Sequence, residues 1–209
     1  MSHARRCRSV PRRRPARVNS AALGLITMLL LTGCASSSRD SMDQGGTYTF
    51  VSPGGQTQFF YDPPASRGTV GTLSGQSLTR PDAATSLNDY RDQIVVLNLW
   101  GSWCAPCRTE TPDLEQTATA TRSDGVQLLG INVKDSRTAA ADYVRNREVS
   151  YPSIYDPAGR TMLALRGIPR SVVPLTIVLD RHHRVAAVFL TTVTADELIA
   201  TVQRLAAEK

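Results

Sequence analysis

The 209-residue sequence predicts an α/β fold, a three-layer sandwich in which helices flank a central mixed β-sheet. The apolar, β-branched run 94–100 (IVVLNLW) has the composition of a strand buried on both faces. Strand-like and helix-like segments then alternate along the chain. Two apolar segments at 175–179 and 185–189 are typical of a hairpin, and an amphipathic helix follows them. This alternation, closed by a hairpin and a helix, is typical of a sheet covered by helices.

The elements after residue 68 follow from local signals. Ser136 is placed as the N-cap of one helix, and Thr194 with Glu197 forms a capping-box pattern for the last helix. Pro112 is expected to kink the helix that contains it. The expected elements, in chain order, are a strand at 69–79, a helical turn at 87–91, a strand at 94–100, a helix at about 104–120, a strand at 126–133, a helix at 136–147, a short strand at 154–155, a short helix at 157–165, strands at 175–179 and 185–189, and a helix from 194.

The N-terminal segment has the features of a secretory signal. Its first eighteen residues carry seven arginines and no acidic residue, and the mostly apolar stretch 21–31 is too short to span a bilayer. The stretch ends in Leu-Thr-Gly-Cys34, which resembles a bacterial lipobox, so Cys34 is expected to be lipidated and to become the new N-terminus. An ordinary signal peptide and an uncleaved anchor are the alternatives. Each of these places the rest of the chain outside the cytoplasm, and the lipobox predicts anchoring at the outer face of a bacterial cell membrane.

The organisation of the rest follows from composition. We expect a signal peptide at 1–33, a flexible Ser/Gly-rich tether at 34–47, an N-terminal extension at 48–68 and one domain at 69–209. The extension has two short aromatic segments, YTFV and QFFY, around a Pro-Gly-Gly turn. These segments either pair as a hairpin or lie extended on the domain surface. Without the seven arginines of the signal, the chain has 17 basic and 18 acidic side chains. The basic pI of the whole sequence therefore does not indicate nucleic-acid binding.

Two cysteines, Cys104 and Cys107, directly follow the buried run 94–100. At the start of a helix, positions three apart face the same way, so the two sulfurs can reach each other. Unpaired N–H groups and the helix dipole favour the thiolate of the first cysteine, which is the form that attacks disulfides. A zinc half-site is the alternative, but it requires further ligands. The other cysteines and histidines are Cys7, Cys34, His3 and the pair His182-His183. The strand context favours redox chemistry over metal binding.

The stretch LNLWGSWCAPCRTETP, with Val173-Pro174 before an apolar strand, resembles the thioredoxin superfamily. More narrowly, it is similar to the membrane-tethered TlpA/ResA-type thiol–disulfide oxidoreductases of bacteria over about residues 69–206. Asn98 stands where thioredoxin has a buried aspartate, as is common in this branch. Segment 132–166 matches the helix-plus-strand insertion of the branch.

The resemblance implies a role for several side chains. Cys104 would be the exposed nucleophile and Cys107 the resolving thiol, and the two would form the redox disulfide. Glu110 matches a buried acid that tunes thiol titration; a solvated helix charge is the alternative. Pro174 takes the place of a cis-proline that faces the disulfide, although Val173 departs from the Thr or Gly often found before it. The remaining site residues are Trp100 and Trp103, expected to shield the active site, and Arg108, expected to face solvent.

The activity implied is reversible thiol–disulfide exchange outside the cytoplasm, and the expected direction is the reduction of client disulfides such as those of apocytochrome c during cytochrome c maturation. No cofactor and no metal is implied, and the implied partners are thiol-bearing client proteins and a transmembrane thiol electron donor. The protein is expected to be a monomer. A general envelope dithiol oxidase and a non-catalytic binding module are alternatives. A thiol peroxidase is disfavoured, because Gly101 and Leu97 stand where the peroxiredoxin signature requires Thr and Pro.

Overall fold

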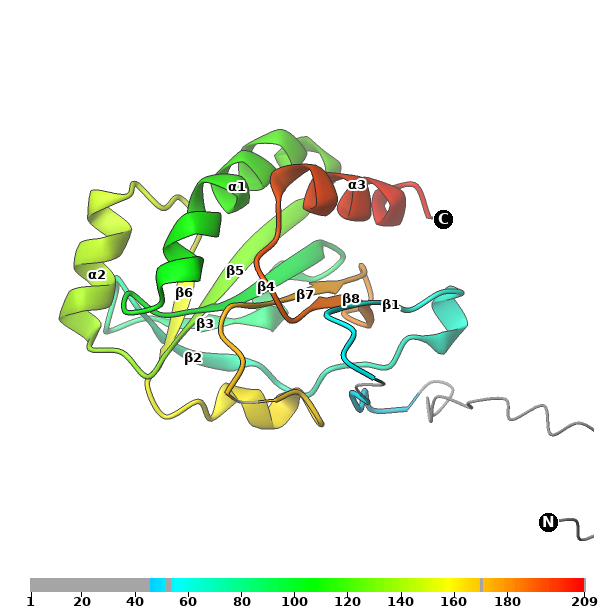
Figure 1. Ribbon diagram of the computed structural model, residues 1–209, viewed down its shortest axis with the longest axis horizontal. Coiled ribbons are helices and arrows are strands. Elements are labelled where there is room, and N and C mark those ends of the chain that lie inside the picture. Colours follow the sequence, from blue (N-terminus) through cyan, green and yellow to red (C-terminus); the bar gives the residue numbers. More distant parts are fainter. Residues whose placement is uncertain (1–45, 52–53, 170, 209) are drawn as a thin grey trace, which may run out of the picture. The chain divides into compact units, whose positions relative to one another are not determined.

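The computed structural model describes residues 46–51, 54–169 and 171–208. The predicted signal peptide, Cys34 and most of the predicted tether lie outside the described residues. The described part contains an eight-stranded mixed sheet with the strand order β1-β8-β7-β4-β5-β6-β2-β3 (Figure 1). The strands are β1 (Gln58–Phe60), β2 (Ser74–Ser77), β3 (Ala84–Ser86), β4 (Ile94–Trp100), β5 (Val126–Val133), β6 (Ser153–Asp156), β7 (Leu175–Leu179) and β8 (Val185–Phe189).

The sheet is parallel at its centre and antiparallel at both sides. Strands β4, β5 and β6 run parallel to one another, whereas β7, β8 and β1 continue the sheet antiparallel on one side and β2 and β3 do so on the other. The parallel connections from β4 to β5 and from β5 to β6 each pass through a helix, whereas the antiparallel pairs β2–β3 and β7–β8 are joined by short connections. The sheet confirms the predicted mixed α/β class.

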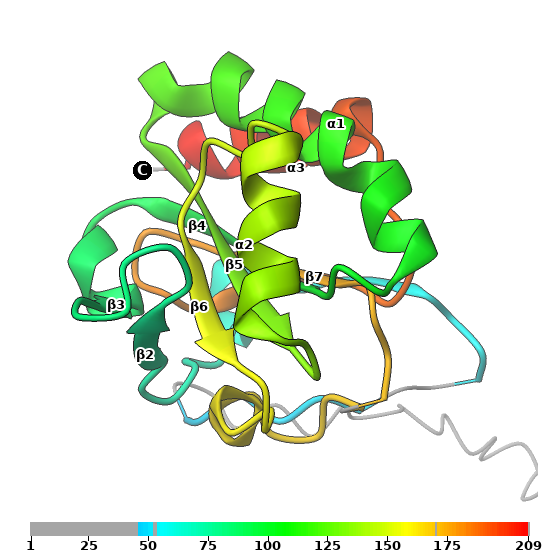
Figure 2. The ribbon, with the colours of Figure 1, turned by 90° about the vertical axis from the view of Figure 1, so that its left-hand side faces the viewer.

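Three helices flank the sheet: α1 (Ala105–Thr121), α2 (Arg137–Asn146) and α3 (Ala195–Ala206). Helices α1 and α3 pack against each other on one face, and α2 lies on the side of β6 (Figure 2). Helix α2 contacts α1 through the hydroxyl groups of Tyr143 and Thr111, which lie 2.8 Å apart. The predicted caps are confirmed, because Ser136 accepts a hydrogen bond from the N–H of Ala139 and Thr194 forms a capping box with Glu197. Within the part of the chain that the structure describes, no helix is long and apolar enough to cross a membrane.

Both faces of β4 are buried, as its composition predicts. Alternate side chains point to opposite faces of a strand. Ile94 and Val96 therefore join the core beneath α1 and α3, whereas Val95, Leu97 and Leu99 join the core on the other face. Asn98 has the same parity as Ile94 and Val96, so it points to the face that α1 covers.

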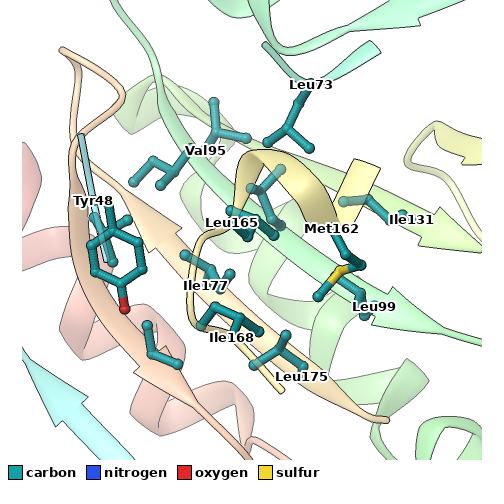
Figure 3. Close-up of a cluster of buried hydrophobic side chains, with 14 of the residues drawn as sticks. Tyr48, Leu73, Val95, Leu99, Ile131, Met162, Leu165, Ile168, Leu175 and Ile177 are labelled. Atoms are coloured by element: carbon teal, nitrogen blue, oxygen red, sulfur yellow. The ribbon is translucent and has the colours of Figure 1, made fainter. Parts of the chain in front are cut away.

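The second face is covered without a long helix. Its core contains apolar side chains of the central strands together with Met162, Leu165 and Ile168, which belong to or follow the short 3₁₀ helix η4 (Thr161–Ala164) (Figure 3). Tyr48 lies in the same core. The helix expected at 157–165 is thus a single 3₁₀ turn, and the strand expected at 69–79 is regular only over β2.

The aromatic segments of 48–61 adopt neither expected arrangement. Their backbones do not pair with each other: β1 pairs with β8, and the N–H of Phe50 donates to the carbonyl of Arg166. Instead, the rings of Phe50 and Phe59 meet edge to face, and the hydroxyl groups of Tyr48 and Tyr61 lie 2.9 Å apart. These four side chains are buried, and burial of their large apolar area stabilises this arrangement. The extension therefore contributes to the sheet and the core of the domain.

Candidate active site

The two cysteines lie where the loop from β4 enters α1. Cys104 is the N-cap of α1, and it is joined to Cys107 by a disulfide bond. The Sγ atom of Cys104 also accepts a hydrogen bond of 3.2 Å from the backbone N–H of Cys107. Both residues are only 3% exposed, so exposure in the disulfide form does not distinguish the predicted nucleophile from the resolving thiol. The N–H group aimed at Cys104 does distinguish them, because it favours negative charge on that sulfur.

A small apolar cluster surrounds the disulfide. It contains Leu78, Trp100 and Ala140 together with both cysteines, and Val173 packs against it. Val173 is joined to the buried Pro174 by a cis peptide bond immediately before β7. The predicted cis-proline turn therefore lies beside the cluster that holds the disulfide. The role of Pro174 in holding a partner strand stays a prediction.

The two tryptophans of the motif differ in environment. Trp100 is buried in the cluster, and its Nε1 donates to Ser153 Oγ at 3.2 Å. Trp103 is 50% exposed, and its Nε1 donates to the carbonyl of Val133. Its indole covers Gly101 so closely that a Cβ at that position would lie 2.4 Å from Nε1. Trp103 is thus an exposed apolar surface next to the disulfide, and its predicted shielding of the thiolate remains a prediction.

Glu110 is buried, with 1% of its surface exposed. It lies one turn after Cys107 on α1, facing β4. Its Oε1 accepts a hydrogen bond of 2.9 Å from Asn98 Nδ2, and its Oε2 accepts one of 3.2 Å from the N–H of Val193. Burial raises the pKa of this carboxyl group to about 7, although both hydrogen bonds act in the opposite direction. A carboxyl group with this pKa can exchange a proton near neutral pH.

Asp135 is a site residue that the sequence reasoning did not identify. Its carboxylate accepts hydrogen bonds from the N–H and the hydroxyl of Ser102, which lies two residues before Cys104. The available signal was its position two residues after the predicted strand 126–133, since the carboxyl ends of parallel strands meet at one edge of a sheet. Thr176 was also missed, and it accepts a hydrogen bond of 3.1 Å from Asn98 Nδ2.

The remaining predicted residues lie apart from this constellation. Arg108 is exposed on α1, as expected. Cys34, the predicted lipid attachment site, is outside the described residues. Among the residues that the structure describes, no group of three His, Cys, Asp or Glu side chains is arranged to hold a metal ion.

Comparisons with known proteins agree with this geometry. The model of the AhpC/TSA family matches residues 75–188, more than half of the chain. The thiol-disulfide oxidoreductase ResA of Geobacillus kaustophilus is 27% identical over 112 residues, which are 54% of this chain and 63% of that protein. The thiol:disulfide interchange protein HelX of Rhodobacter capsulatus is 31% identical over 120 residues, 57% of this chain and 65% of that protein. The chain thus spans a little under two thirds of these curated relatives.

Solved structures match over more of the chain. A secreted thiol-disulfide isomerase from Corynebacterium glutamicum is 44% identical with a TM-score of 0.76, and the match covers 78% of this chain and 100% of that one. A DsbF homologue from Corynebacterium diphtheriae is 49% identical with a TM-score of 0.72, covering 76% of this chain and 99% of the other. These matches confirm the resemblance to thioredoxin-fold thiol–disulfide oxidoreductases. The family match and the two structural likenesses together show that the chain belongs to the AhpC/TSA family of thioredoxin-fold proteins.

Proposed function

We propose that the protein is a thiol–disulfide oxidoreductase that acts outside the cytoplasm through its Cys104–Cys107 pair. The observation that carries this proposal is the disulfide at the N-terminus of α1, with the N–H of Cys107 aimed at the sulfur of Cys104. A buried carboxyl group one helical turn away, with a pKa of about 7, supports it. The names of the relatives, thiol-disulfide oxidoreductase and thiol:disulfide interchange protein, point to the same chemistry.

The exchange follows from thiol chemistry. In the reducing direction, the thiolate of Cys104 attacks one sulfur of a client disulfide, forms a mixed disulfide and expels the other client sulfur as a thiolate, which takes up a proton. Cys107 then loses its proton to Glu110 and attacks the Sγ of Cys104. The Cys104–Cys107 disulfide forms, the mixed disulfide breaks, and two electrons pass to the client. In this scheme Pro174 borders the strand of the client.

We propose that reduction is the physiological direction and that apocytochrome c is among the clients. The compartment favours oxidation of thiols, so a dedicated reductant has a purpose there. A haem-attachment Cys-x-x-Cys-His site must be reduced before it can bond haem. A lipid on Cys34 would keep a monomeric domain at the outer face of the membrane, beside a transmembrane thiol donor. Neither nucleic acid nor a cofactor has a part in this scheme.

A second candidate is isomerisation or oxidation of envelope thiols. It is favoured by the 44% identity to a structure described as a secreted thiol-disulfide isomerase. The two directions differ in reduction potential, because an oxidant has a reduced form that is unusually stable.

The first experiment is reduction of insulin by the purified protein in the presence of dithiothreitol, with Cys104→Ser as the inactive control. The reduction potential, measured in glutathione buffers, then gives the direction. A reductase should have a potential near about −270 mV, whereas a value near about −120 mV would leave a general oxidase. A protein that does not reduce insulin would be a non-catalytic binding module. Consumption of peroxide without added thioredoxin would indicate a thiol peroxidase.

A further inference from the structure

The two oxygens of the buried Glu110 carboxyl group have donors of different kinds. Oε2 faces the backbone N–H of Val193, and Oε1 faces the side-chain amide of Asn98. Asn98 lies opposite Thr176 in the pairing of β4 with β7, and its Nδ2 donates to both Glu110 Oε1 and Thr176 Oγ1. All these donors suit an ionised carboxylate, which only accepts hydrogen bonds.

The same arrangement conflicts with a protonated Glu110. The N–H of Val193 belongs to the backbone and cannot turn, so this donor stays directed at Oε2 in both protonation states. A proton on Oε1 that follows the existing contact with Asn98 points at Nδ2. Two donors would then face each other in a buried site. This contact destabilises the protein by about as much as one buried polar group without a hydrogen-bond partner. Because the carboxyl pKa is about 7, both protonation states are populated near neutral pH.

We propose that the side-chain amide of Asn98 turns over when Glu110 gains a proton, so that Oδ1 accepts the hydrogen bond from Glu110 Oε1. Turning an amide exchanges a donor for an acceptor at nearly the same place, because the oxygen and the NH₂ group are almost equal in size. The hydroxyl of Thr176 can follow by rotation, since it can accept from Nδ2 in one state and donate to Oδ1 in the other. Asn98 thereby acts as a positioning residue for proton uptake at Glu110.

The inference rests on the proposed function in one respect only, namely that the proton taken up by Glu110 comes from Cys107. In that step the thiol of Cys107 loses a proton, Oε1 of Glu110 gains it, and Asn98 exchanges none. An amide at position 98 can donate to the ionised carboxylate and accept from the protonated carboxyl group, whereas an apolar side chain there could do neither. A second carboxyl group there would contact Glu110 directly, and the pair would share one proton.

Other groups around Glu110 shift its titration but provide no alternative to Asn98. Asp113, on the same helix, raises the pKa of Glu110 through its charge, and it accepts a hydrogen bond from the N–H of Ala195. Tyr151 is buried and interacts electrostatically with Glu110. Cys107 lies one helical turn away on α1. Strands β4 and β7 present the neutral side chains of Asn98 and Thr176, and of these the Asn98 amide contacts Glu110 directly.

The direct test is nuclear magnetic resonance of the full-length, isotope-labelled protein in its disulfide form. The Glu110 carboxyl carbon reports protonation, and nuclear Overhauser contacts from the Asn98 NH₂ group report its orientation. Contacts to the Thr176 side chain should be present above the pKa of Glu110 and lost below it. Glu110→Gln provides a fixed reference: its carbonyl must face Val193, so its NH₂ group faces position 98 and should hold the amide turned at every pH. Contacts that persist across the titration would overturn the proposal.

Variants separate positioning from a structural role. Asn98→Leu removes a charge-assisted hydrogen bond from the carboxylate and should raise the proton affinity of Glu110 about tenfold. Asn98→Asp should split the titration into two steps. Thr117→Val, which removes a buried hydroxyl from the same helix, should reduce stability and leave the titration of Glu110 unchanged. A merely structural Asn98 would behave like this control. Because the measurement uses the oxidised protein without a client, a failed insulin assay would count against the proposed function and leave this result intact.

Discussion

Asp135 accepts hydrogen bonds of 2.6 Å from the backbone N–H of Ser102 and 2.9 Å from its hydroxyl. The same carboxylate accepts hydrogen bonds from Asn132 Nδ2 and from the N–H of Ser136 at the start of α2. The loop that delivers Cys104 is thereby tied to the end of the neighbouring strand. Four donors on one carboxylate make the two loops a single unit, which keeps the disulfide in place relative to β5 and α2.

Asp135→Ala should therefore destabilise the protein by about 2–3 kcal/mol, because it leaves several donors without a partner. Thiol exchange by Cys104 should also slow, since the loop before it loses its anchor. Urea unfolding and insulin reduction measure the two effects. Asp142→Ala is the matched control on α2, because the exposed ion pair of Asp142 with Arg145 should contribute about 0.5 kcal/mol or less. Equal stability of the two variants would contradict the anchoring role of Asp135.

The stability of the protein should depend on pH through Glu110. Its pKa is raised from 4.5 to about 7 in the folded state by burial. Between these values the folded protein binds more protons than the unfolded chain, so this group makes the free energy of unfolding fall as pH rises. The loss should reach up to about 3 kcal/mol above pH 7. Glu110→Gln should remove this component, and urea unfolding of both proteins from about pH 5 to about pH 8 gives the difference. Parallel pH profiles would show that Glu110 is not the group responsible.

The two cysteines should differ in reactivity once reduced. The helix N-terminus and the N–H of Cys107 favour a thiolate at Cys104, so limited iodoacetamide at neutral pH should label Cys104 first. Cys107→Ser should accumulate a mixed disulfide with clients, because nothing remains to resolve it, whereas Cys104→Ser should not. Peptide mapping by mass spectrometry identifies the labelled site. Faster labelling of Cys107 would reverse the two roles.

Arg67 should be important for stability far from the disulfide. Its side chain is fully buried, and it forms ion pairs with Asp62, Asp180 and Glu208. Arg67→Ala should cost about 3–5 kcal/mol, because it empties a fully buried site and removes three ion pairs at once, although Asp180 keeps its pair with Arg184. Arg204→Ala removes an exposed contact with the same Asp62 and should cost about 1 kcal/mol or less. Thermal and urea unfolding compare the pair. A mild effect of Arg67→Ala would mean that water replaces its contacts.

The predicted anchor at Cys34 can be tested in cells. Cys34→Ala removes the sulfur to which a lipid would attach, so the protein should leave the membrane fraction or remain unprocessed, with its insulin reduction intact. Fractionation and immunoblotting measure this. Cys7→Ala is the matched control, because Cys7 lies among the arginines before the apolar stretch. Membrane association and processing of Cys34→Ala that both equal those of wild type would indicate an uncleaved helix.

Local signals in the sequence determined much of the fold. The bounds of β4, β5, β7 and β8 coincide with the apolar runs, because a central strand must bury nearly every side chain. The caps at Ser136 and Thr194 were predictable, because a cap depends on residues within one helical turn. The position of the two cysteines at a helix start was predictable for the same reason.

Only the tertiary structure decided which distant groups meet. Four aromatic residues of 48–61 join the main core, although their spacing equally suits a hairpin or a surface segment; they are Tyr48, Phe50, Phe59 and Tyr61. Asp135 and Ser102 are 33 residues apart, and Asn98, Glu110 and Thr176 come from three elements. The hydrophobic periodicity of the sequence cannot predict such contacts, because a polar side chain is compatible with solvent or with any buried partner. The sequence by itself thus determined the redox pair and the strands that carry it, whereas packing of β4, α1 and β7 determined the buried surroundings of Glu110 beside it.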